Sequence, residues 1–267
     1  MTTEPDLATL RTLAERVARE SGELLREGMS RVRASVDTKS TGTDMVTEMD
    51  RASEALISDR LLSARPLDGI LGEEGADEPG TSGVRWVVDP LDGTTNYVYG
   101  FPGFNVSIAA EIAGTSMVGV VYDVVRDELF SAIRGGGATR NGQAIRPSVT
   151  TQIGLALVGT GFSYDPERRR RQAEVLVTVL PRVRDIRRQG AAALDLCSVA
   201  CGRLDAYYER GLAPWDLAAG GLIATEAGAV VSDLVGGAPA AGAVLAASPG
   251  VADALLALLA TAGAATA

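Results

Sequence analysis

The chain has 267 residues, 46% hydrophobic and 22% charged, with a formal net charge of −9, which predicts a soluble globular protein with a large core. The acidic charge argues against nonspecific binding of nucleic acid by the whole surface. Because the chain contains no histidine, a Ser-His-Asp or Cys-His enzyme and a histidine-type zinc site are excluded, and any catalysis must use carboxylates, hydroxyls, lysine, arginine or a hard metal ion.

The first half of the chain, about 1–150, predicts an α+β arrangement with an antiparallel meander. Apolar residues recur with a helical period over 6–27, and a second helix is expected over 50–64. Strands are expected at 69–74, 84–88, 106–112, 117–125 and 128–133. A polar loop is expected over 76–83. The glycines of 134–137 predict a plain hairpin, because the Lys-Ser/Thr of a phosphate loop does not follow them.

The second half, about 151–267, alternates strands with helices and predicts an α/β arrangement. Strands are expected at 153–160, 185–188, 205–209, 230–234 and 243–247. Helices are expected at 165–180, 191–203, 215–227 and 249–261. Since neither a linker nor a repeat separates the halves, we predict one domain. The basic run Arg168–Arg171 is most simply a solvated helix face, with a partner-binding patch as the alternative.

The chain ends and the cysteines predict a cytoplasmic protein. The N-terminal MTTEPDLATL is polar and acidic, so no signal peptide is expected. The apolar stretch 238–267 is interrupted by Pro249 and Asp253, which predicts a strand and a helix rather than a membrane span. Cys197 and Cys201 are interpreted as structural thiols, because side chains four apart on a helix rarely form a disulfide.

Acidic residues recur at the expected boundaries of these elements. They are Asp44 with Asp50, Glu73 with Glu74, Asp89 with Asp92, and Asp216 after Trp215. Each of them alone is most simply a helix cap or a turn residue. Taken together, they indicate a site at which several carboxylates converge.

The stretch Asp89–Thr95, DPLDGTT, suggests what such a site would bind. Pro90 is expected to force a turn after the strand, so that Asp89 lies at the carboxyl end of that strand. The amides of residues 93–95 would then be unpaired and would attract an anion, especially phosphate. Carboxylates beside an anion site require bridging cations, and Mg²⁺ commonly joins carboxylates to phosphate. The hypothesis that follows is hydrolysis of a phosphate monoester by metal-activated water, which a threonine hydroxyl orients.

These stretches resemble the inositol monophosphatases, a family of Mg²⁺-dependent, lithium-sensitive phosphatases, and the segment GLAPWD is of the bacterial type. The matches are GEE at 72–74, WVVDPLDGTTNYVYGFP at 86–102 and RRQGAAALDLCSVACGRLDAYYERGLAPWDLAAG at 187–220, and the spacing of TDMVTEMD at 43–50 also fits. The resemblance covers nearly the whole chain. It implies a layered α-β-α-β-α sandwich, usually assembled as a homodimer, which agrees with the α+β and α/β halves.

The resemblance also implies ligands for two or three Mg²⁺ ions. Glu73, Asp89 and the carbonyl of Leu91 would hold the first ion, and Asp89, Asp92 and Asp216 would hold the second. Glu73 would also help to position a third, weaker ion. An all-oxygen site of this kind suits a chain without histidine.

For the reaction, the resemblance implies a catalytic set and a substrate-binding set. Thr94, paired with Asp50, would orient the attacking water, and Asp44 would support the metal–water network that Glu73 also serves. The substrate would contact Asp92, Gly93, Thr94, Gly190, Ala191, Ala192 and Glu209. In that set, the amides near Gly93 and Thr94 would receive phosphate, and Glu209 would accept hydroxyls of an inositol or sugar ring. Ala213 lies where animal members often carry histidine, which leaves the substrate pocket less defined.

We therefore predict a cytoplasmic, Mg²⁺-dependent hydrolase that converts inositol 1-phosphate to inositol and phosphate. Histidinol phosphate and sugar phosphates or bisphosphates remain alternative substrates for the same metal core. A regulatory binding protein of the transcription and RNA machinery is a further alternative, for which Arg168–Arg171 is the one basic feature. The expected partners are a small phosphorylated polyol or sugar and a second copy of the chain, with no membrane and no nucleic acid.

Overall fold

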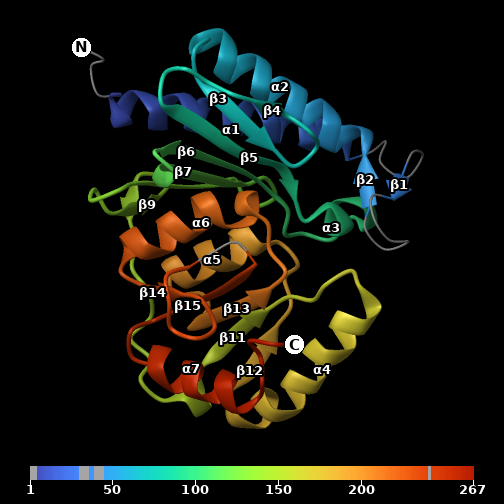
Figure 1. Ribbon diagram of the computed structural model, residues 1–267, viewed down its shortest axis with the longest axis vertical. Helices are drawn as coiled ribbons and strands as arrows, with labels where there is room; N and C mark the ends of the chain where they lie inside the picture. The colour runs from blue at the N-terminus through green and yellow to red at the C-terminus, as the bar shows by residue number, and fades with distance from the viewer. Residues whose placement is uncertain (1–4, 30–35, 39–44, 240–241) are drawn as a thin grey trace.

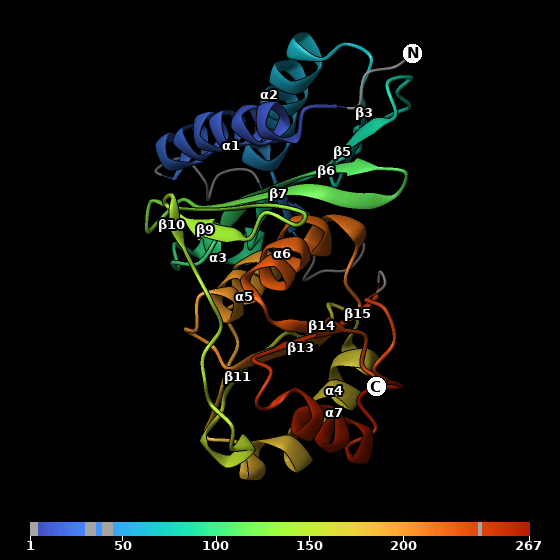
Figure 2. The ribbon, with the colours of Figure 1, turned by 90° about the vertical axis from the view of Figure 1, so that its left-hand side faces the viewer.

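The computed structural model describes residues 5–29, 36–38, 45–239 and 242–267. They form alternating layers, with an eight-stranded sheet near one end of the molecule and a five-stranded sheet near the other (Figures 1 and 2). Helices α5 (Ala192–Ala200) and α6 (Pro214–Ala227) lie between the sheets, and other helices cover the outer face of each (Figure 2). The predicted α-β-α-β-α sandwich is therefore confirmed.

The outer layer of the first half consists of α1 (Leu7–Gly28) and α2 (Glu48–Ala64). Asp6 caps the start of α1, because its side chain accepts a hydrogen bond from the Ala8 amide at 3.1 Å. The apolar residues of α1 recur at helical spacing and form one buried face. The first expected helix is confirmed, and the second begins slightly before the expected start at Asp50.

The eight-stranded sheet has the order β10-β9-β8-β7-β6-β5-β3-β4, and β3 and β5 are its parallel pair. Its strands are β3 (Gly69–Gly72), β4 (Asp77–Glu78), β5 (Val84–Asp92), β6 (Asn105–Ile112), β7 (Thr115–Asp123), β8 (Glu128–Ile133), β9 (Ala138–Arg140) and β10 (Gln143–Ala144). The expected meander corresponds to β6, β7 and β8. The expected loop over 76–83 is wrong at β4, because pairing with the edge of β3 overrides the weak strand preference of its two acids.

A separate two-stranded sheet joins β1 (Val36–Thr38) to β2 (Met45–Thr47). The segment between them, 39–44, is expected to be a loop and lies outside the described residues. Asp44 is part of that segment, so its predicted role stays a prediction.

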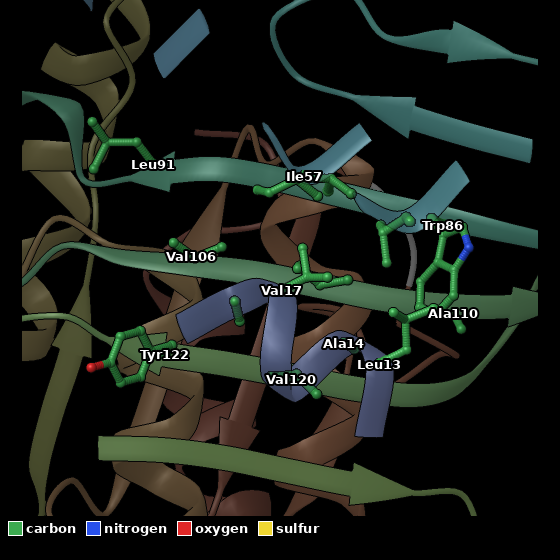
Figure 3. Close-up of a cluster of buried hydrophobic side chains, with 14 of the residues drawn as sticks. Leu13, Ala14, Val17, Ile57, Trp86, Leu91, Val106, Ala110, Val120 and Tyr122 are labelled. Carbon is green, nitrogen blue, oxygen red and sulfur yellow. The ribbon is translucent and has the colours of Figure 1, made fainter. Parts of the chain in front are cut away.

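The core of the first half lies between α1, α2 and the eight-stranded sheet (Figure 3). Val17 of α1, Ile57 of α2 and Val106 of β6 are fully buried in it. Trp86 of β5 is also fully buried, and its indole N–H donates a hydrogen bond to Asp68 at 3.0 Å. Burial of each such large apolar side chain contributes about 1.5–3 kcal/mol to stability. This core therefore fixes β5, and with it the carboxylates at its end, against two helices.

The five-stranded sheet has the order β12-β11-β13-β15-β14. Its strands are β11 (Leu157–Thr160), β12 (Asp185–Arg187), β13 (Ala206–Arg210), β14 (Val230–Ser232) and β15 (Ala243–Ala247). Helices α4 (Pro166–Val179) and α7 (Ala252–Thr261) pack on its outer face (Figure 1). The expected strand 153–160 is wrong at its start, because the amides of Leu155 and Ala156 bond to carbonyls three residues earlier and form a 3₁₀ turn.

The glycine-rich turn at 134–137 joins β8 to β9, so the predicted hairpin is confirmed. The amides of Gly135 and Gly137 donate hydrogen bonds to the Glu226 carboxylate at 2.9 and 3.0 Å. The turn therefore binds an anion that the protein itself supplies. This contact ties the first sheet to the last turn of α6, whose first turn carries Asp216.

The apolar C-terminal stretch forms β15 and α7, as predicted, and Leu255 and Leu259 of α7 are fully buried against the second sheet. None of the described helices has both the length and the apolar character needed to pass through a bilayer. Cys197 and Cys201 are both free thiols. The assignment of the two halves to one domain stays a prediction.

Candidate active site

The end of β5 is irregular, and the irregularity brings two carboxylates to one side of the strand. A turn is expected at Pro90, but β5 continues through it to Asp92, so that expectation is wrong. Proline lacks the amide that a regular ladder requires, and the pairing of β5 with β6 shifts register between Asp89 and Asp92. In a regular strand, residues three apart would point to opposite faces. The shift allows both carboxylates to line one cavity.

Asp216, in the first turn of α6, lies close to Asp89 and Asp92. Pro214 lies in the first turn, where a missing amide costs little. The Asp216 side chain accepts a hydrogen bond from the Ala213 amide at 2.6 Å, which fixes its orientation. One carboxylate oxygen from each of Asp89, Asp92 and Asp216 lies within 4.8 Å of the others. The fold therefore brings Asp216 of α6 to the two acids at the end of β5, which lie more than 120 positions earlier in the sequence.

Asp92 is held by the start of α5. The amides of Ala192 and Ala193 donate hydrogen bonds to its carboxylate at 3.2 and 2.8 Å, and the side-chain amide of Asn105 donates a third at 2.8 Å. Helix α5 has no side-chain cap of its own, because its N-cap residue is Ala191. Asp92 supplies the missing acceptor. The hydrogen bonds that Ala193 and Asn105 donate to Asp92 are not predicted from the sequence. The one local signal is that Ala191 cannot cap α5, so the first amides of this helix need an acceptor from elsewhere.

Burial and mutual repulsion control the charge of this cluster. Burial raises the pKa of Asp89 well above its ordinary value, and the carboxylates of Glu73, Asp92 and Asp216 raise it further. Burial and the charge of Asp92 likewise raise the pKa of Asp216 well above its ordinary value. Burial also raises the pKa of Asp92, although its hydrogen bond from Asn105 opposes the change. A bound cation would reverse this preference for the neutral forms. All the donors are oxygen, so the residues fit a hard divalent cation such as Mg²⁺.

Glu73 joins the cluster from the end of β3. Its amide donates a hydrogen bond to the Val88 carbonyl of β5 at 3.3 Å, which places its side chain beside that of Asp89. The two carboxyls share a hydrogen bond, which also raises the pKa of Asp89 after the larger effects of burial and charge. The neighbouring Glu74 is anchored differently, since its amide donates to the Glu54 carboxylate at 2.8 Å. Of the two acids in GEE, Glu73 is the one that lines the cavity.

A buried hydroxyl–carboxylate pair lies next to the acids. The Thr94 hydroxyl is 3.0 Å from an oxygen of Asp50 and 3.2 Å from the carbonyl of Leu91. Asp50 is fully buried in the first turn of α2. A hydroxyl has one proton, and the carboxylate is the stronger acceptor for it. Donation to Asp50 leaves the lone pairs of Thr94 free to accept a hydrogen bond from the cavity.

Gly93 connects β5 to the short helix α3 (Thr94–Tyr99) in a left-handed conformation, with a φ of 95°. A side chain there would also approach the Gly103 carbonyl to 2.8 Å. Glycine is therefore required both by the backbone conformation and by the close packing. The first amides of α3 have no acceptor within the helix, which is the condition the sequence predicts for phosphate binding.

A cavity of about 390 Å³ joins these residues to the second half of the chain. Its wall contains the predicted residues Glu73, Asp89, Leu91, Asp92, Gly93, Thr94, Gly190, Ala191, Ala192, Glu209 and Asp216. Asp50 lies behind this wall and contacts it through Thr94. Arg188, Trp215 and residues 162–165 also line the cavity and are not predicted from the sequence. The cavity therefore has an acidic end near β5 and a second end near β13.

Glu209 occupies the second end. It shares a face of β13 with Tyr207, which is fully buried and donates a hydrogen bond to Glu209 at 2.6 Å. Any side chain at Gly161 of the neighbouring segment would overlap the Glu209 carboxyl. Burial raises the pKa of Glu209 to about 7, although the Tyr207 hydrogen bond and the charge of Arg188 oppose the change. Tyr207 and Gly161 are further residues that the sequence does not reveal.

Asp195 of α5 is a buried acid that accepts no hydrogen bond from any described residue. The residue is 1% exposed, and neither carboxylate oxygen has a partner among the described residues. Burial raises its pKa well above the ordinary value, and the charges of Glu209 and Asp92 raise it further. A buried carboxylate without partners destabilises the folded state once it ionises.

We expect Asp195→Asn to raise the free energy of unfolding at pH 8 by about 1–3 kcal/mol, since the buried charge is removed. The pKa of Asp195 in the folded protein lies above its value in the unfolded chain, which is about 4. Between these two pKa values, the free energy of unfolding falls as pH rises, because ionisation is easier in the unfolded chain. The gain should therefore be smaller at pH 5 than at pH 8. Urea unfolding at both pH values measures it, with Glu23→Gln on the exposed face of α1 as the control. An equal gain at both pH values, or a loss at pH 8, would contradict the prediction.

Comparison with known proteins adds an independent finding. A family model described as "Inositol monophosphatase family" matches residues 6–263. Inositol-1-monophosphatase SuhB of Mycobacterium tuberculosis is 48% identical over 278 residues, which cover 96% of each chain. Nus factor SuhB of Escherichia coli K12 is 42% identical over 230 residues, covering 84% of this chain and 85% of that protein.

The solved structures agree with the sequence comparison. The structure of Thermotoga maritima IMPase superposes with a TM-score of 0.87 and 31% identity, covering 94% of this chain and 96% of the other. Similarity over this length extends to both sheets and to the helices between them.

Proposed function

Because the chain belongs to the inositol monophosphatase family and is therefore a phosphatase, we propose that it hydrolyses inositol 1-phosphate to inositol and inorganic phosphate with bound Mg²⁺. The observation that carries this proposal is the convergence of Asp89, Asp92 and Asp216 within 4.8 Å at one end of a cavity whose other end holds Glu209. The acidic end suits cations and a phosphate, and Glu209 suits a polyol. A relative of 48% identity is named an inositol-1-monophosphatase, which supports the choice of substrate.

We propose that two or three Mg²⁺ ions bind at the acidic end. Glu73, Asp89 and the Leu91 carbonyl would hold one ion, Asp89, Asp92 and Asp216 would hold another, and Glu73 would help to hold a third. The raised pKa of Asp89, caused by burial and then by its acidic neighbours, supports the need for positive charge here. Bound Mg²⁺ would supply Lewis acidity to the phosphoryl group and to the leaving oxygen.

The residues beside the acids would position water and phosphate. The Thr94 hydroxyl, by donating its proton to Asp50, would present lone pairs to a water molecule and orient it toward phosphorus. The amides near Gly93 and Thr94 would receive the phosphate oxygens. Asp44, outside the described residues, would support the same network.

The other end of the cavity would recognise the alcohol. Gly190, Ala191 and Ala192 would contact the ring, and Glu209 would accept hydrogen bonds from its hydroxyls. Tyr207 would hold the Glu209 carboxyl in place through the 2.6 Å hydrogen bond. Because burial brings the pKa of Glu209 to about 7, ring binding should weaken below neutral pH, where Glu209 becomes protonated and accepts fewer hydrogen bonds.

A substrate panel tests the proposed function. We expect inositol 1-phosphate to have a higher kcat/KM than histidinol phosphate at saturating Mg²⁺, because a polyol ring offers hydroxyl donors to Glu209. Phosphate release from both compounds at equal concentration, with and without Mg²⁺, measures the preference. Far faster turnover of histidinol phosphate would select the alternative substrate, and no Mg²⁺-dependent release from any phosphate ester would refute the proposal.

The basic run Arg168–Arg171 gives little support to the alternative that this protein is a regulatory binding protein of the transcription and RNA machinery. Arg170 forms ion pairs with Glu167 and Glu174, and Arg171 forms one with Glu167. These pairs neutralise part of the run within α4 and favour a solvated helix face. A relative is named a Nus factor, but phosphatase chemistry accounts for the acidic cluster and the cavity of this chain.

We also propose that the protein is a cytoplasmic homodimer that lithium inhibits. Tyr99 and Phe101, at the end of α3, are 54% and 64% exposed, and a second copy of the chain would cover such apolar surface. The free thiols Cys197 and Cys201 suit a reducing compartment. Lithium would compete with Mg²⁺ at one of the proposed positions, as the family resemblance implies.

A further inference from the structure

The side of α2 that faces the candidate active site carries polar residues, although it is buried. Asp50, Ser53 and Glu54 lie three and four positions apart, so their side chains share one side of the helix, and all three are buried. The Ser53 hydroxyl donates a hydrogen bond to the Pro90 carbonyl of β5 at 2.8 Å. Glu54 contacts a different segment, the turn 73–76 that follows β3.

Both oxygens of the Glu54 carboxylate bind that turn. They accept hydrogen bonds from the amides of Glu74 at 2.8 Å and Ala76 at 2.9 Å. A side chain at Gly72 would overlap one of these oxygens, so glycine at the end of β3 leaves room for the carboxylate. A charged acceptor forms stronger hydrogen bonds with amides than a neutral one does. Glu54 therefore anchors the turn to α2, although it is not among the described residues that line the cavity.

Glu73 lies in the anchored turn and is held on both sides. Its own amide donates to the Val88 carbonyl at 3.3 Å, and the next amide, that of Glu74, donates to Glu54. The backbone at Glu73 is therefore tied to β5 on one side and to α2 on the other. These ties oppose the repulsion between the neighbouring carboxylates of Glu73 and Asp89. They keep the Glu73 side chain in the cavity wall.

We propose that Glu54 is a positioning residue for Glu73 and thereby sets the affinity for the Mg²⁺ ion that Glu73 would bind. This inference rests on the proposed metal-dependent reaction and adds to it a residue outside the cavity wall. The hydrogen bonds of Glu54 order the turn before Mg²⁺ binds, so less free energy of binding is lost in ordering it. At saturating Mg²⁺, Glu73 is held by the ion as well, so Glu54 affects Mg²⁺ affinity more than kcat.

Calorimetric titration of the metal-free protein with Mg²⁺ alone tests this inference, together with the Mg²⁺ dependence of phosphate release from inositol 1-phosphate. Glu54→Gln is nearly isosteric, but its NH₂ group would face one of the two amide donors. It should raise both the Mg²⁺ dissociation constant and the Mg²⁺ concentration for half-maximal activity roughly tenfold, the cost of losing a charge-assisted hydrogen bond. The kcat at saturating Mg²⁺ should change less than about twofold.

Glu54→Asp separates the position of the carboxylate from its charge. It keeps the charge but is one methylene shorter, so it cannot reach both amides. It should also weaken Mg²⁺ binding, by roughly fivefold or more. Melting with EDTA establishes that each variant folds, and Glu54→Asp provides the test if Glu54→Gln does not fold.

A double-mutant cycle with Glu73→Gln separates positioning from a general effect on the fold. If Glu54 acts through Glu73, Glu54→Gln should change the Mg²⁺ dissociation constant less than about twofold once residue 73 is already glutamine. Asp68→Asn is the matched control, because Asp68 is also buried and accepts hydrogen bonds from Trp86 at 3.0 Å and Ser82 at 2.6 Å outside the cavity. It should lower the melting temperature and leave Mg²⁺ binding unchanged.

Unchanged Mg²⁺ binding in folded Glu54→Gln would overturn the proposal, and so would an equal effect of this variant with and without the Glu73 carboxylate. Normal binding by Glu54→Asp beside weakened binding by Glu54→Gln would show that the charge of Glu54 acts rather than its hydrogen bonds, and would also overturn it. A wild type that binds Mg²⁺ but releases no phosphate from the ester would refute the proposed function, whereas the titrations would still decide the role of Glu54.

Discussion

Asp89→Asn should reduce kcat/KM by roughly 10³-fold or more, which corresponds to about 4 kcal/mol of transition-state stabilisation. The same substitution should raise the thermal stability of the metal-free protein. Asp89 is 1% exposed, and Glu73, Asp92 and Asp216 all repel its charge. A neutral amide removes that repulsion and also removes a charged ligand that two of the proposed metal positions share. Initial rates with Mg²⁺, and melting with EDTA, measure the two opposite effects.

A buried acid that is paired with an arginine is the matched control. Asp123 is also 1% exposed, but its carboxylate accepts hydrogen bonds from the Arg126 side chain at 2.8 Å and from the Val125 amide at 3.1 Å. Asp123→Asn should therefore lower stability by about 1–3 kcal/mol and leave kcat nearly unchanged. Near-normal activity of Asp89→Asn, or a lower melting temperature for it, would contradict the metal-site assignment.

Asp92→Asn is a less decisive substitution. Asp92 accepts hydrogen bonds from Asn105 and from the amides of Ala192 and Ala193. An amide at this position would direct N–H groups toward those donors and would weaken the start of α5. A loss of activity would then combine a metal effect with a packing effect. Asp89 accepts a hydrogen bond from the Leu91 amide at 3.1 Å, which the side-chain oxygen of an asparagine can still accept, so Asp89→Asn mixes the two effects less.

Removal of divalent cations should abolish activity, and added Mg²⁺ should restore it. Mg²⁺ should also stabilise the fold, because it binds carboxylates that otherwise repel one another in the folded protein. At a concentration 100 times the dissociation constant, the gain would be about 2.7 kcal/mol, or roughly 5–10 °C in melting temperature. Activity assays and melting curves, each with EDTA and with Mg²⁺ in excess, measure the response.

Potassium chloride at equal ionic strength is the control for general screening of charge. It should give a much smaller shift than Mg²⁺, because screening acts weakly on buried groups. The Asp89→Asn variant should lose most of the Mg²⁺ shift. Activity that is indifferent to EDTA, or an equal shift with potassium chloride, would count against bound Mg²⁺.

Most helices and strands are predictable because their signals are local. Apolar periodicity locates α1, and β-branched runs separated by short turns locate the meander. One error is local, since a 3₁₀ turn replaces the start of the strand expected at 153–160. Two others arise where pairing with a neighbouring strand outweighs local preference. Asp77 and Glu78 become a strand because β3 offers an edge, and β5 passes through Pro90 because β6 absorbs the irregular register.

In the candidate site, too, some residues have a local signal in the sequence and others have none. The absence of histidine excludes imidazole as base or ligand and favours carboxylates, hydroxyls, lysine, arginine or a hard metal ion. The motif DPLDGTT and the pair Trp215-Asp216 then indicate which acids are candidates. The roles of Asn105, Tyr207 and Arg188 have no local signature, because each depends on a residue from another layer.

The family, the order of most helices and strands, and the acids proposed for the site can be inferred from the sequence alone, because motif identity and periodicity are properties of short segments. The packing of the layers is needed to see that Asp216 meets Asp89 and Asp92, that Asp195 is buried without a hydrogen-bonding partner among the described residues, and that Arg188 lines the cavity. Burial, charge repulsion and hydrogen bonding depend on distances between layers, which short segments do not encode. Those distances are set when α5 and α6 pack between the two sheets.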